Sequence, residues 1–364
     1  MKAAVLYEIG RPLVVEEVEL DPPKEREVRV RIAAAGICRS DLHFMKGEAL
    51  IPLPAVLGHE GAGVVEAVGA EVISVKPGDH VVLSFVSACG RCSFCLGGRS
   101  NLCDDHAATG PMMLDGTARL HKGDMRISHM GKVACFAEQA VVPEAACVPV
   151  PDDLGWPQAA FIGCCTTTGV GAAIFAADVR PGSSVAVFGC GGVGLNVLQG
   201  AALKSAGMII AVDLDEGRLG FSRKFGATHF VNAGSEEPVA AIQALTGGRG
   251  VDNAFEAFGS AETIRQAYQA VRKGGTVVVA GLAPVGEAAA IDAMELVRQE
   301  KVLKGTYYGS ARPAVDMLTM VDLYRSGKID LDSLVGKQYS LAQINDAYSD
   351  LEAASLGRGV ITRF

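Results

Sequence analysis

The sequence lacks the features with which proteins bind polyanions or enter membranes. Its 33 lysines and arginines are outnumbered by 41 aspartates and glutamates, the formal net charge is −8, and no stretch gathers basic residues. Nucleic acids and anionic lipids attract clustered positive charge, so we exclude both as partners. The opening MKAAVLYEIG turns acidic and strand-like instead of forming a secretory signal. We therefore expect a cytoplasmic protein.

Long uninterrupted apolar runs are also missing. Two uncharged windows, 154–177 and 181–203, approach the length of a transmembrane helix, but Gly, Thr or Pro interrupts both. The second window has the pattern of a buried strand, a tight turn and a helix, so we expect no membrane span. Internal repeats and low-complexity linkers are absent as well.

What remains is the composition of a globular protein, with 49% hydrophobic and 20% charged residues. A chain of 364 residues exceeds one ordinary core, which favours two domains. Residues 1 to about 150 alternate short β-branched runs with Gly, Pro and Asp turns, and this pattern predicts a β-rich domain. From about 183 onward, apolar strands alternate with helix-length segments, which predicts a parallel sheet covered by helices on both faces.

The segment GCGGVG is the first chemical signature. Gly189, Gly191 and Gly194 fit G-x-G-x-x-G between the strand VAVF and a helical run, and Asp213 ends the next strand. Glycines let the backbone approach a pyrophosphate, and a carboxylate at that position accepts hydrogen bonds from the adenosine ribose. The same carboxylate repels a 2′-phosphate, so we expect NAD in preference to NADP. A glycine-rich turn that merely packs a helix on a sheet is the alternative.

Four of the ten cysteines crowd into the segment CGRCSFCLGGRSNLC. Their spacing, C-x2-C-x2-C-x7-C, suits convergence on one tetrahedral zinc ion, a closed structural site formed by Cys89, Cys92, Cys95 and Cys103. An iron–sulfur cluster is a rival, although Asp104 and not proline follows the last cysteine. Disulfides are opposed by a reducing compartment and by the strain of such short rings.

A site closed by four sulfurs has no position for a substrate, so metal chemistry needs other ligands. Cys38, His59 and Cys164 stand in separate motifs, and two sulfurs with one imidazole would leave one zinc position open. The alternative is a pair of buried thiols and a structural histidine. Cys165 is the rival of Cys164. Three further histidines, His106, His121 and His129, could suggest a third metal site, but we expect a solvated loop there.

The motif GHEGAGVVEAVGAEV resembles, glycine for glycine, the zinc signature of the zinc-containing alcohol dehydrogenases of the medium-chain dehydrogenase/reductase family. The resemblance continues through GICRSDLH, the four-cysteine loop, GCCTTTGVGAA, GCGGVG and LYRSGKIDLDSLV, and so covers essentially the whole chain. It implies a β-rich, GroES-like (chaperonin-10-like) catalytic domain, 1–165 and 309–364, with a zinc lobe at about 89–103. A Rossmann NAD-binding domain would occupy 166–308.

The resemblance also implies roles for individual residues. Cys38, His59 and Cys164 match the catalytic zinc ligands, and the four-cysteine set matches the structural zinc. Asp41 matches the carboxylate that orients the ligand histidine, Glu60 a carboxylate near the zinc, Ser40 and His43 a proton relay, and Phe85 an aromatic wall of the substrate pocket. Cofactor contacts would come from Arg39, Thr168, Gly189, Gly191, Gly192, Val193, Gly194, Asp213, Arg218 and Arg358.

The implied activity is NAD-dependent oxidation of primary alcohols to aldehydes, with two zinc ions per chain. Ser40 in place of a bulkier threonine leaves space, which favours aromatic or medium-chain alcohols. One alternative is a thiol-dependent formaldehyde dehydrogenase acting on S-hydroxymethyl adducts, with Arg119 and Lys122 as candidates to grip a carboxylate. Another is a non-catalytic nicotinamide-binding structural or sensor protein. We expect a homodimer or homotetramer.

Overall fold

The computed structural model describes every residue from 1 to 364. Its chain forms two compact units, each described below by itself. The first unit comprises Met1–Cys164, Arg312–Leu323 and Leu334–Phe364, and the second comprises Cys165–Ala311 and Tyr324–Ser333.

The domain bounds differ in part from those that the sequence led us to expect. We placed Cys165, 309–311 and 324–333 in the catalytic domain, but all three pack with the second unit, and 324–333 is the longest of them. The reason is local, because the Gln199 side chain accepts a hydrogen bond from the Asp330 N–H and donates one to the Asp330 carbonyl. This pairing of one amide with one peptide unit holds the segment on the second unit.

The first unit is built on two β-sheets. One sheet has the order β2-β1-β5-β9-β8-β3, and the other has the order β11-β7-β6-β4-β19-β18 with β10 also paired to β4. The bounds are β1 (Lys2–Leu6), β2 (Val14–Glu17), β3 (Glu19–Leu20), β4 (Glu27–Gly36), β5 (Ala55–Val56), β6 (Gly61–Val68), β7 (His80–Leu83), β8 (Leu120–Lys122), β9 (Met125–His129), β10 (Gln139–Pro143), β11 (Cys147–Pro149), β18 (Val335–Ser340) and β19 (Arg358–Arg363).

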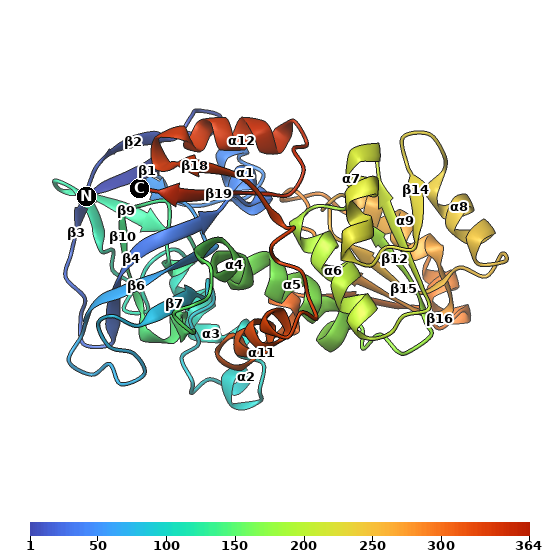
Figure 1. The fold of residues 1–364 in the computed structure, drawn as a ribbon, viewed down its shortest axis with the longest axis horizontal. Coiled ribbons are helices and arrows are strands. Elements are labelled where there is room, and N and C mark those ends of the chain that lie inside the picture. The colour runs from blue at the N-terminus through green and yellow to red at the C-terminus, as the bar shows by residue number, and fades with distance from the viewer. The chain divides into compact units, whose positions relative to one another are not determined.

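Strand β4 shows why these residues form a half-buried sheet. Val28, Val30 and Ile32 point into the core, while the alternate residues Arg29 and Arg31 both form ion pairs with Glu66 on the other face. This two-residue period is the pattern of an antiparallel strand with one covered face. The C-terminal strand β19 lies antiparallel to β4, so the red end of the chain joins the blue sheet in Figure 1.

Helices of the first unit are short and lie at the edges of the sheets. They are α1 (Arg39–Lys46), α2 (Ser93–Leu96), α3 (Asp104–Thr109), α4 (Trp156–Phe161), α11 (Pro313–Arg325), which runs to Leu323 in this unit, and α12 (Ile344–Glu352). Only Ile37 and Cys38 separate the end of β4 from the start of α1, the helix that carries the proposed relay.

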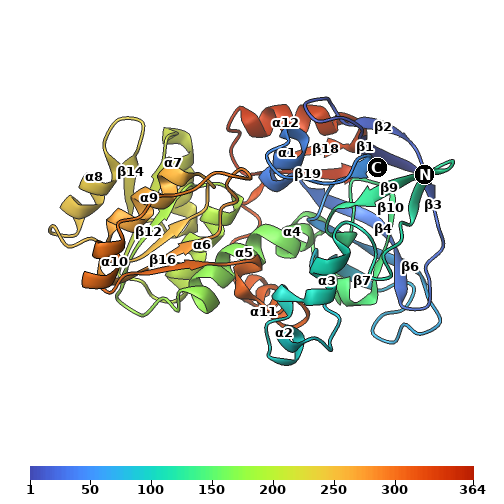
Figure 2. The same ribbon diagram turned by 180° about the vertical axis from the view of Figure 1, so that it is seen from behind.

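The second unit is a parallel sheet of order β14-β13-β12-β15-β16-β17. This is the strand order of a Rossmann fold. Strands β12, β13 and β14 are added toward one edge of the sheet, and β15, β16 and β17 are added toward the other edge, so the order switches between β12 and β15. Figure 1 shows α6 and α7 on one face of the sheet, and Figure 2 shows α9 and α10 on the other. The strands are β12 (Ser184–Phe188), β13 (Met208–Asp213), β14 (His229–Asn232), β15 (Val251–Glu256), β16 (Val271–Val279) and β17 (Val302–Gly305). The helices are α5 (Thr167–Gly171), α6 (Gly192–Leu203), α7 (Glu216–Ser222), α8 (Pro238–Leu245), α9 (Ala261–Ala270) and α10 (Ala293–Arg298).

One helical stretch has the length and hydropathy of a membrane span. It is Trp156–Ala176, and 89% of its apolar window is buried inside the structure. It is not a single regular helix, because π-helical turns at Ile162–Thr166 and Ala172–Ala176 interrupt it. Burial of this kind is what a core helix shows.

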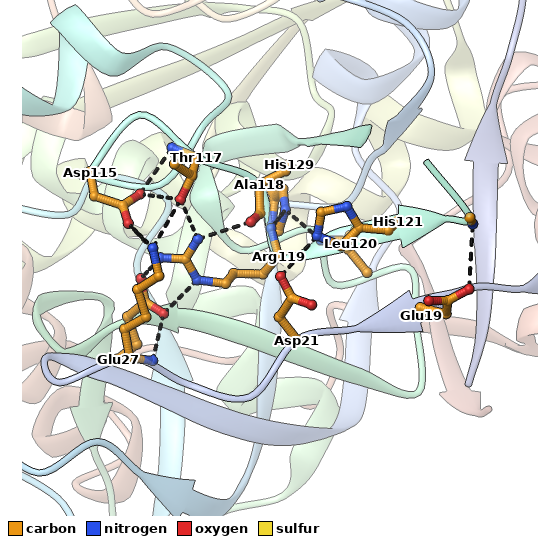
Figure 3. A network of polar contacts seen from close by, with 12 residues as sticks. Glu19, Asp21, Glu27, Asp115, Thr117, Ala118, Arg119, Leu120, His121 and His129 are labelled. Carbon is orange, nitrogen blue, oxygen red and sulfur yellow. Dashed lines mark hydrogen bonds and ion pairs between the residues drawn. The ribbon is translucent and has the colours of Figure 1, made fainter. Parts of the chain in front are cut away.

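A buried ion-pair network orders the segment between α3 and β10 in the first unit (Figure 3). The Arg119 guanidinium, 1% exposed, donates to both carboxylate oxygens of Glu27, at 2.7 and 2.5 Å, and to Asp115 at 2.8 Å. His129 is equally buried, and its Nε2 accepts the backbone N–H groups of Arg119 and Leu120. Burial lowers the pKa of His129 to about 3, so the ring is a neutral structural acceptor.

We expect Arg119→Ala to lower the free energy of unfolding by about 3–5 kcal/mol, because it leaves Glu27 buried without its partner. Urea titration followed by the fluorescence of Trp156, the single tryptophan, reports on the first unit. Lys122→Ala is the matched control, since Lys122 pairs with Glu16 while 48% exposed, and it should cost at most about 1 kcal/mol. Equal losses in the two variants would contradict the role assigned to burial.

Candidate functional site

Cys38, His59 and Cys164 come together in one buried cluster of the first unit. Their possible ligand atoms all lie within 4.8 Å of one another, and the Cys164 Sγ is 3.2 Å from the His59 Nε2. Cys38 follows β4, His59 follows β5, and Cys164 lies in the π-helical turn Ile162–Thr166. π-Turns of this kind recur at functional sites because they re-aim one side chain. The adjacent Cys165 is also buried but belongs to no such cluster.

Asp41 sets the orientation of the His59 ring. Its Oδ1 accepts the Gly58 N–H at 2.8 Å and lies 3.2 Å from the His59 Nδ1. Since a carboxylate can only accept, Nδ1 carries a hydrogen, and Nε2 is the ring nitrogen on the side of the sulfurs. Burial alone would lower the pKa of His59, but the charges of Asp41 and Cys38 outweigh it and raise that pKa well above its ordinary value.

The Cys38 thiol responds in the opposite sense. A hydrogen bond from Cys164 lowers the pKa of Cys38 well below its ordinary value, against the effect of burial. A thiolate and a ring nitrogen in a buried pocket are the forms in which cysteine and histidine bind metal. Two sulfurs and one imidazole suit a zinc ion with one open position, so the residues fit the catalytic metal that the family resemblance implies.

Ser40 and Phe85 contact this cluster, and His43 lies on the same helix as Ser40. The Ser40 hydroxyl oxygen is 3.8 Å from the Cys38 Sγ, and His43 follows three residues later on α1, on the same face of the helix. The Phe85 ring meets the His59 ring edge-on, with centroids 5.2 Å apart and planes at 89°. All three expected neighbours of the metal thus belong to the first unit; their roles remain predictions.

Glu60 and Arg358 form a buried ion pair in the first unit. The Arg358 guanidinium bonds the Glu60 carboxylate, although the two residues are separated by almost the whole chain, and both side chains are less than a tenth exposed. The sequence suggested a phosphate contact for Arg358 and a place near the zinc for Glu60. In the structure the carboxylate next to the ligand His59 is the partner of Arg358.

The four cysteines of the lobe also converge. Their sulfur atoms lie within 4.8 Å of one another. Backbone N–H groups point at them: the Cys89 Sγ accepts from Cys92 at 3.3 Å, and the Cys103 Sγ accepts from Cys89 at 3.2 Å. A hydrogen bond from the Cys95 backbone lowers the pKa of Cys92 to about 7.

The lobe around these cysteines has almost no apolar core. Helices α2 and α3 bury none of their residues. A segment of this kind depends on a bound ion for its order, because apolar burial cannot supply it. Four convergent sulfurs with inward N–H groups fit the structural zinc.

The glycine motif of the second unit forms a cradle. Gly189 has φ = +95°, which other residues rarely adopt, and a Cβ on Gly194 would lie 1.8 Å from the Gly189 carbonyl oxygen. Gly191 precedes α6, and the space beside its Cα is open. Asp213 ends β13, and its Oδ2 accepts the Cys190 N–H at 2.8 Å. This arrangement fits a dinucleotide, with the pyrophosphate at the helix N-terminus and the ribose at Asp213.

The remaining predicted residues are placed as follows. Arg39 begins α1 and is exposed, Thr168 is buried on α5, Gly192 and Val193 open α6, and Arg218 lies on α7, half-buried. Arg119 and Lys122 are engaged by Glu27, Asp115 and Glu16. His106, His121 and His129 form no metal cluster, and His129 is buried and not solvated.

Two features escaped sequence reasoning. Lys301 ends the charged stretch RQEK, yet its side chain is 2% exposed and donates to Glu295 and to the Tyr268 carbonyl. Glu48 contacts the His43 ring. The only signal in the sequence for the contact between Glu48 and His43 is that Glu48 directly follows Gly47, the glycine at the end of α1.

Comparison with known proteins identifies the family. The family model described as "Alcohol dehydrogenase GroES-like domain" matches residues 24–152, and "Zinc-binding dehydrogenase" matches 192–325. An NDMA-dependent alcohol dehydrogenase of Amycolatopsis methanolica is 42% identical over 99% of this chain and 98% of its own. This chain belongs to the zinc-containing alcohol dehydrogenases of the medium-chain dehydrogenase/reductase family.

Other zinc alcohol dehydrogenases support the same assignment. An S-(hydroxymethyl)glutathione dehydrogenase of Paracoccus denitrificans is 40% identical over 99% of both chains. The crystal structure of benzyl alcohol dehydrogenase from Acinetobacter calcoaceticus, 34% identical, superposes with a TM-score of 0.94 over 100% of this chain and 99% of that one. The expectations of an oxidoreductase with a GroES-like domain, a Rossmann domain and zinc are confirmed, and NAD is the typical cofactor of the family.

Replacing one ligand should remove one ion. We expect wild-type protein to bind about two zinc ions per chain and Cys164→Ser to retain about one, because the closed four-cysteine site keeps its own. Cys165→Ser is the control, since it changes the neighbouring buried thiol and should leave both ions bound. Elemental analysis of dialysed protein measures the ratio. A full zinc content in Cys164→Ser, or the loss of one ion in Cys165→Ser, would overturn the assignment of Cys164.

Proposed function

We propose that this enzyme oxidises aromatic or medium-chain primary alcohols to aldehydes, with NAD as the hydride acceptor, and catalyses the reverse reduction. One observation carries the proposal: a buried Cys2His donor set lies beside a serine and a histidine on one helical face. Three protein ligands leave the fourth zinc position for a substrate oxygen. Likeness to a benzyl alcohol dehydrogenase and the small side chain of Ser40 support an aromatic or medium-chain substrate.

Each residue of the site has a defined task in this scheme. Zinc, held by Cys38, His59 and Cys164, supplies a Lewis acid that favours loss of a hydroxyl proton near neutral pH and polarises a carbonyl. Asp41 keeps Nε2 of His59 directed at the ion. Ser40 accepts the hydroxyl proton of the alcohol, and His43 acts as the base of the relay. Phe85 provides an apolar wall that excludes water.

A second set of residues binds and orients the cofactor. NAD supplies the hydride acceptor. Asp213 accepts hydrogen bonds from the ribose and disfavours a 2′-phosphate, while Arg218 flanks the adenosine. The glycine cradle receives the pyrophosphate. We assign further contacts to Arg39 and Thr168. Arg358 can contribute a phosphate contact only by sharing its guanidinium with Glu60.

A thiol-dependent formaldehyde dehydrogenase remains the second candidate, because one relative bears the name S-(hydroxymethyl)glutathione dehydrogenase. Such a substrate carries carboxylates and needs cations in the pocket. The two cations that we considered, Arg119 and Lys122, already pair with carboxylates. A non-catalytic nicotinamide-binding sensor or structural protein would have no use for an open zinc position beside Ser40 and His43.

We infer that two or more copies associate through the edge strand β17. All four of its residues are exposed at the end of the sheet, which leaves one row of backbone groups available for pairing. Exposed apolar side chains lie nearby in sequence, with Val297 at 75% and Val285 at 71%. A second copy that pairs with this edge would cover both features, giving a homodimer or, by further association, a homotetramer.

Ten free cysteines are compatible with a cytoplasmic location.

The catalytic proposal predicts that benzyl alcohol and hexanol both reduce NAD and that the activity with NADP is weaker. Chelation of zinc should abolish the oxidation of both alcohols. Ser40→Ala should lower kcat about 10²-fold by removing a positioned proton acceptor. Ser349→Ala, an exposed serine on α12, is the control. A thiol–formaldehyde adduct forms a third substrate arm, and NDMA replaces free NAD in a parallel arm because one relative is named for it. Activity that survives complete removal of zinc would refute the proposal.

The assembly proposal predicts that Val302→Lys lowers the mass in solution, because a charge on an edge strand opposes pairing. Ile73→Lys is the control, since Ile73 is 93% exposed in the first unit, far from β17 in sequence. Sedimentation velocity measures both masses. An unchanged oligomer in Val302→Lys would show that β17 is not the interface.

A further inference from the structure

His43 has a partner that neither the family resemblance nor the proposed function assigns. The His43 Nδ1 lies 2.5 Å from the Glu48 Oε2, and both residues belong to the first unit. We propose that Glu48 is a positioning residue of the proton relay, which selects the tautomer of His43 and stabilises its protonated form. This inference rests on the proposed function, because it assumes that His43 takes the proton that leaves the alcohol.

The local backbone brings Glu48 to the ring. Helix α1 ends at Lys46, and Gly47 adopts φ = +74°, which reverses the chain. The N–H groups of Glu48 and Ala49 then donate to the His43 carbonyl, at 2.8 and 3.1 Å. The helix cap therefore anchors Glu48 to the same residue whose ring its side chain contacts. Glu48 is thus attached to His43 twice, by its backbone N–H to the carbonyl and by its side chain to the ring, which restricts the position of the carboxylate.

Hydrogen-bond chemistry determines the tautomer. An ionised carboxylate only accepts, so the Nδ1–H of His43 donates to Glu48. The lone pair of the neutral ring is then at Nε2, which is the nitrogen left to take a proton. Without this partner the ring is no longer held in one tautomer. A base whose second nitrogen is bound by an acceptor is the arrangement by which other enzymes orient a catalytic histidine.

The proton transfer balances with NAD as the hydride acceptor and water as the final proton acceptor. The O–H bond of the alcohol breaks, its proton reaches Nε2 of His43 by way of Ser40, and the alcohol carbon gives hydride to NAD. The imidazolium has two N–H bonds and lies against the Glu48 carboxylate, which offsets its charge. The proton added at Nε2 then leaves to water, so one proton is released for each NADH formed. Glu48 itself is not protonated in the cycle.

The exposure of the pair fits this role. The His43 side chain is only 10% exposed, so its ring depends on protein partners for its hydrogen bonds, whereas the Glu48 carboxylate is 37% exposed and keeps part of its contact with water. A nearby ion pair provides a comparison, because Lys46, the last residue of α1, binds Glu352. The Glu352 carboxylate, 46% exposed against 37% for Glu48, is in a similarly open position but does not contact His43.

The experiment uses the zinc-loaded enzyme and two matched variants, Glu48→Gln and Glu352→Gln, each of which removes one carboxylate charge beside the end of α1. Rapid mixing with NAD and benzyl alcohol measures hydride transfer in a single turnover. We expect Glu48→Gln to slow that step about tenfold, a part of what positioned acid–base catalysis contributes, with KM unchanged. Added imidazole, as an external base, should restore part of the rate. Glu352→Gln should match the wild type.

A second readout needs no turnover. Ring ¹⁵N resonances of histidine-labelled protein distinguish the two tautomers, and the seven histidines allow His43 to be assigned by its absence in His43→Asn. We expect an Nδ1–H ring in the wild type and an Nε2–H ring or a mixture in Glu48→Ala. A wild-type single-turnover rate in Glu48→Gln, or an unchanged Nδ1–H ring in Glu48→Ala, overturns the inference. Absence of NAD reduction in the wild type would refute the proposed function instead, and the ring spectra would still test the contact.

Discussion

The whole site depends on bringing two sulfurs and one imidazole together away from water. Burying ionisable side chains side by side costs free energy unless hydrogen bonds, opposite charges or a metal ion compensate their loss of water. In the protein the charges of Asp41 and Cys38 raise the pKa of His59, and a hydrogen bond from Cys164 lowers the pKa of Cys38, each against the effect of burial. A zinc ion held by these residues would compensate the thiolates, because metal binding takes the place of protons on its ligands.

The surrounding residues follow from that constraint. A ring that must face zinc with Nε2 needs an acceptor at Nδ1, and Asp41 is that acceptor. His43, two residues after Asp41 on α1, has the same kind of contact, with Glu48 as its acceptor. Helix α1 thus carries two carboxylate–histidine contacts, one that directs a ligand at the metal and one that directs a base at the departing proton. The two contacts serve different tasks, because a metal ligand must present Nε2 to the ion, whereas the base of the relay must take up and release a proton at that nitrogen.

Local motifs made much of this architecture predictable. The glycine cradle, the strands β12 to β16 and the four-cysteine lobe each occupy a short segment whose residue types dictate the structure. The catalytic trio could be named only with the help of the family resemblance, because nothing in the spacing of Cys38, His59 and Cys164 shows that the three segments meet.

Other contacts could not have been predicted, since long-range folding decides them. The pairing of Glu60 with Arg358 joins positions 298 residues apart, and it exists because β19 returns beside β4. Arg119 and Glu27 are likewise distant in the sequence, 92 residues apart, and only the folded chain brings them together. Lys301 shows the same difficulty, because a lysine in a charged stretch of the sequence is buried and donates to Glu295 and to the Tyr268 carbonyl. Charged residues were the hardest to place, since the sequence does not reveal which of them find a partner.

This distribution of charge bears on the substrate. Arg119 is almost completely buried, and both its acceptors are carboxylates of the protein itself. Releasing it to bind an anionic substrate would leave Glu27 without compensation, at a cost of several kcal/mol. Arg358 is bound in a similar way to Glu60. An uncharged alcohol requires no such exchange, because it needs only the open metal position, a hydroxyl acceptor and an apolar wall. The buried ion pairs therefore favour a neutral substrate over a carboxylate-bearing thiol adduct.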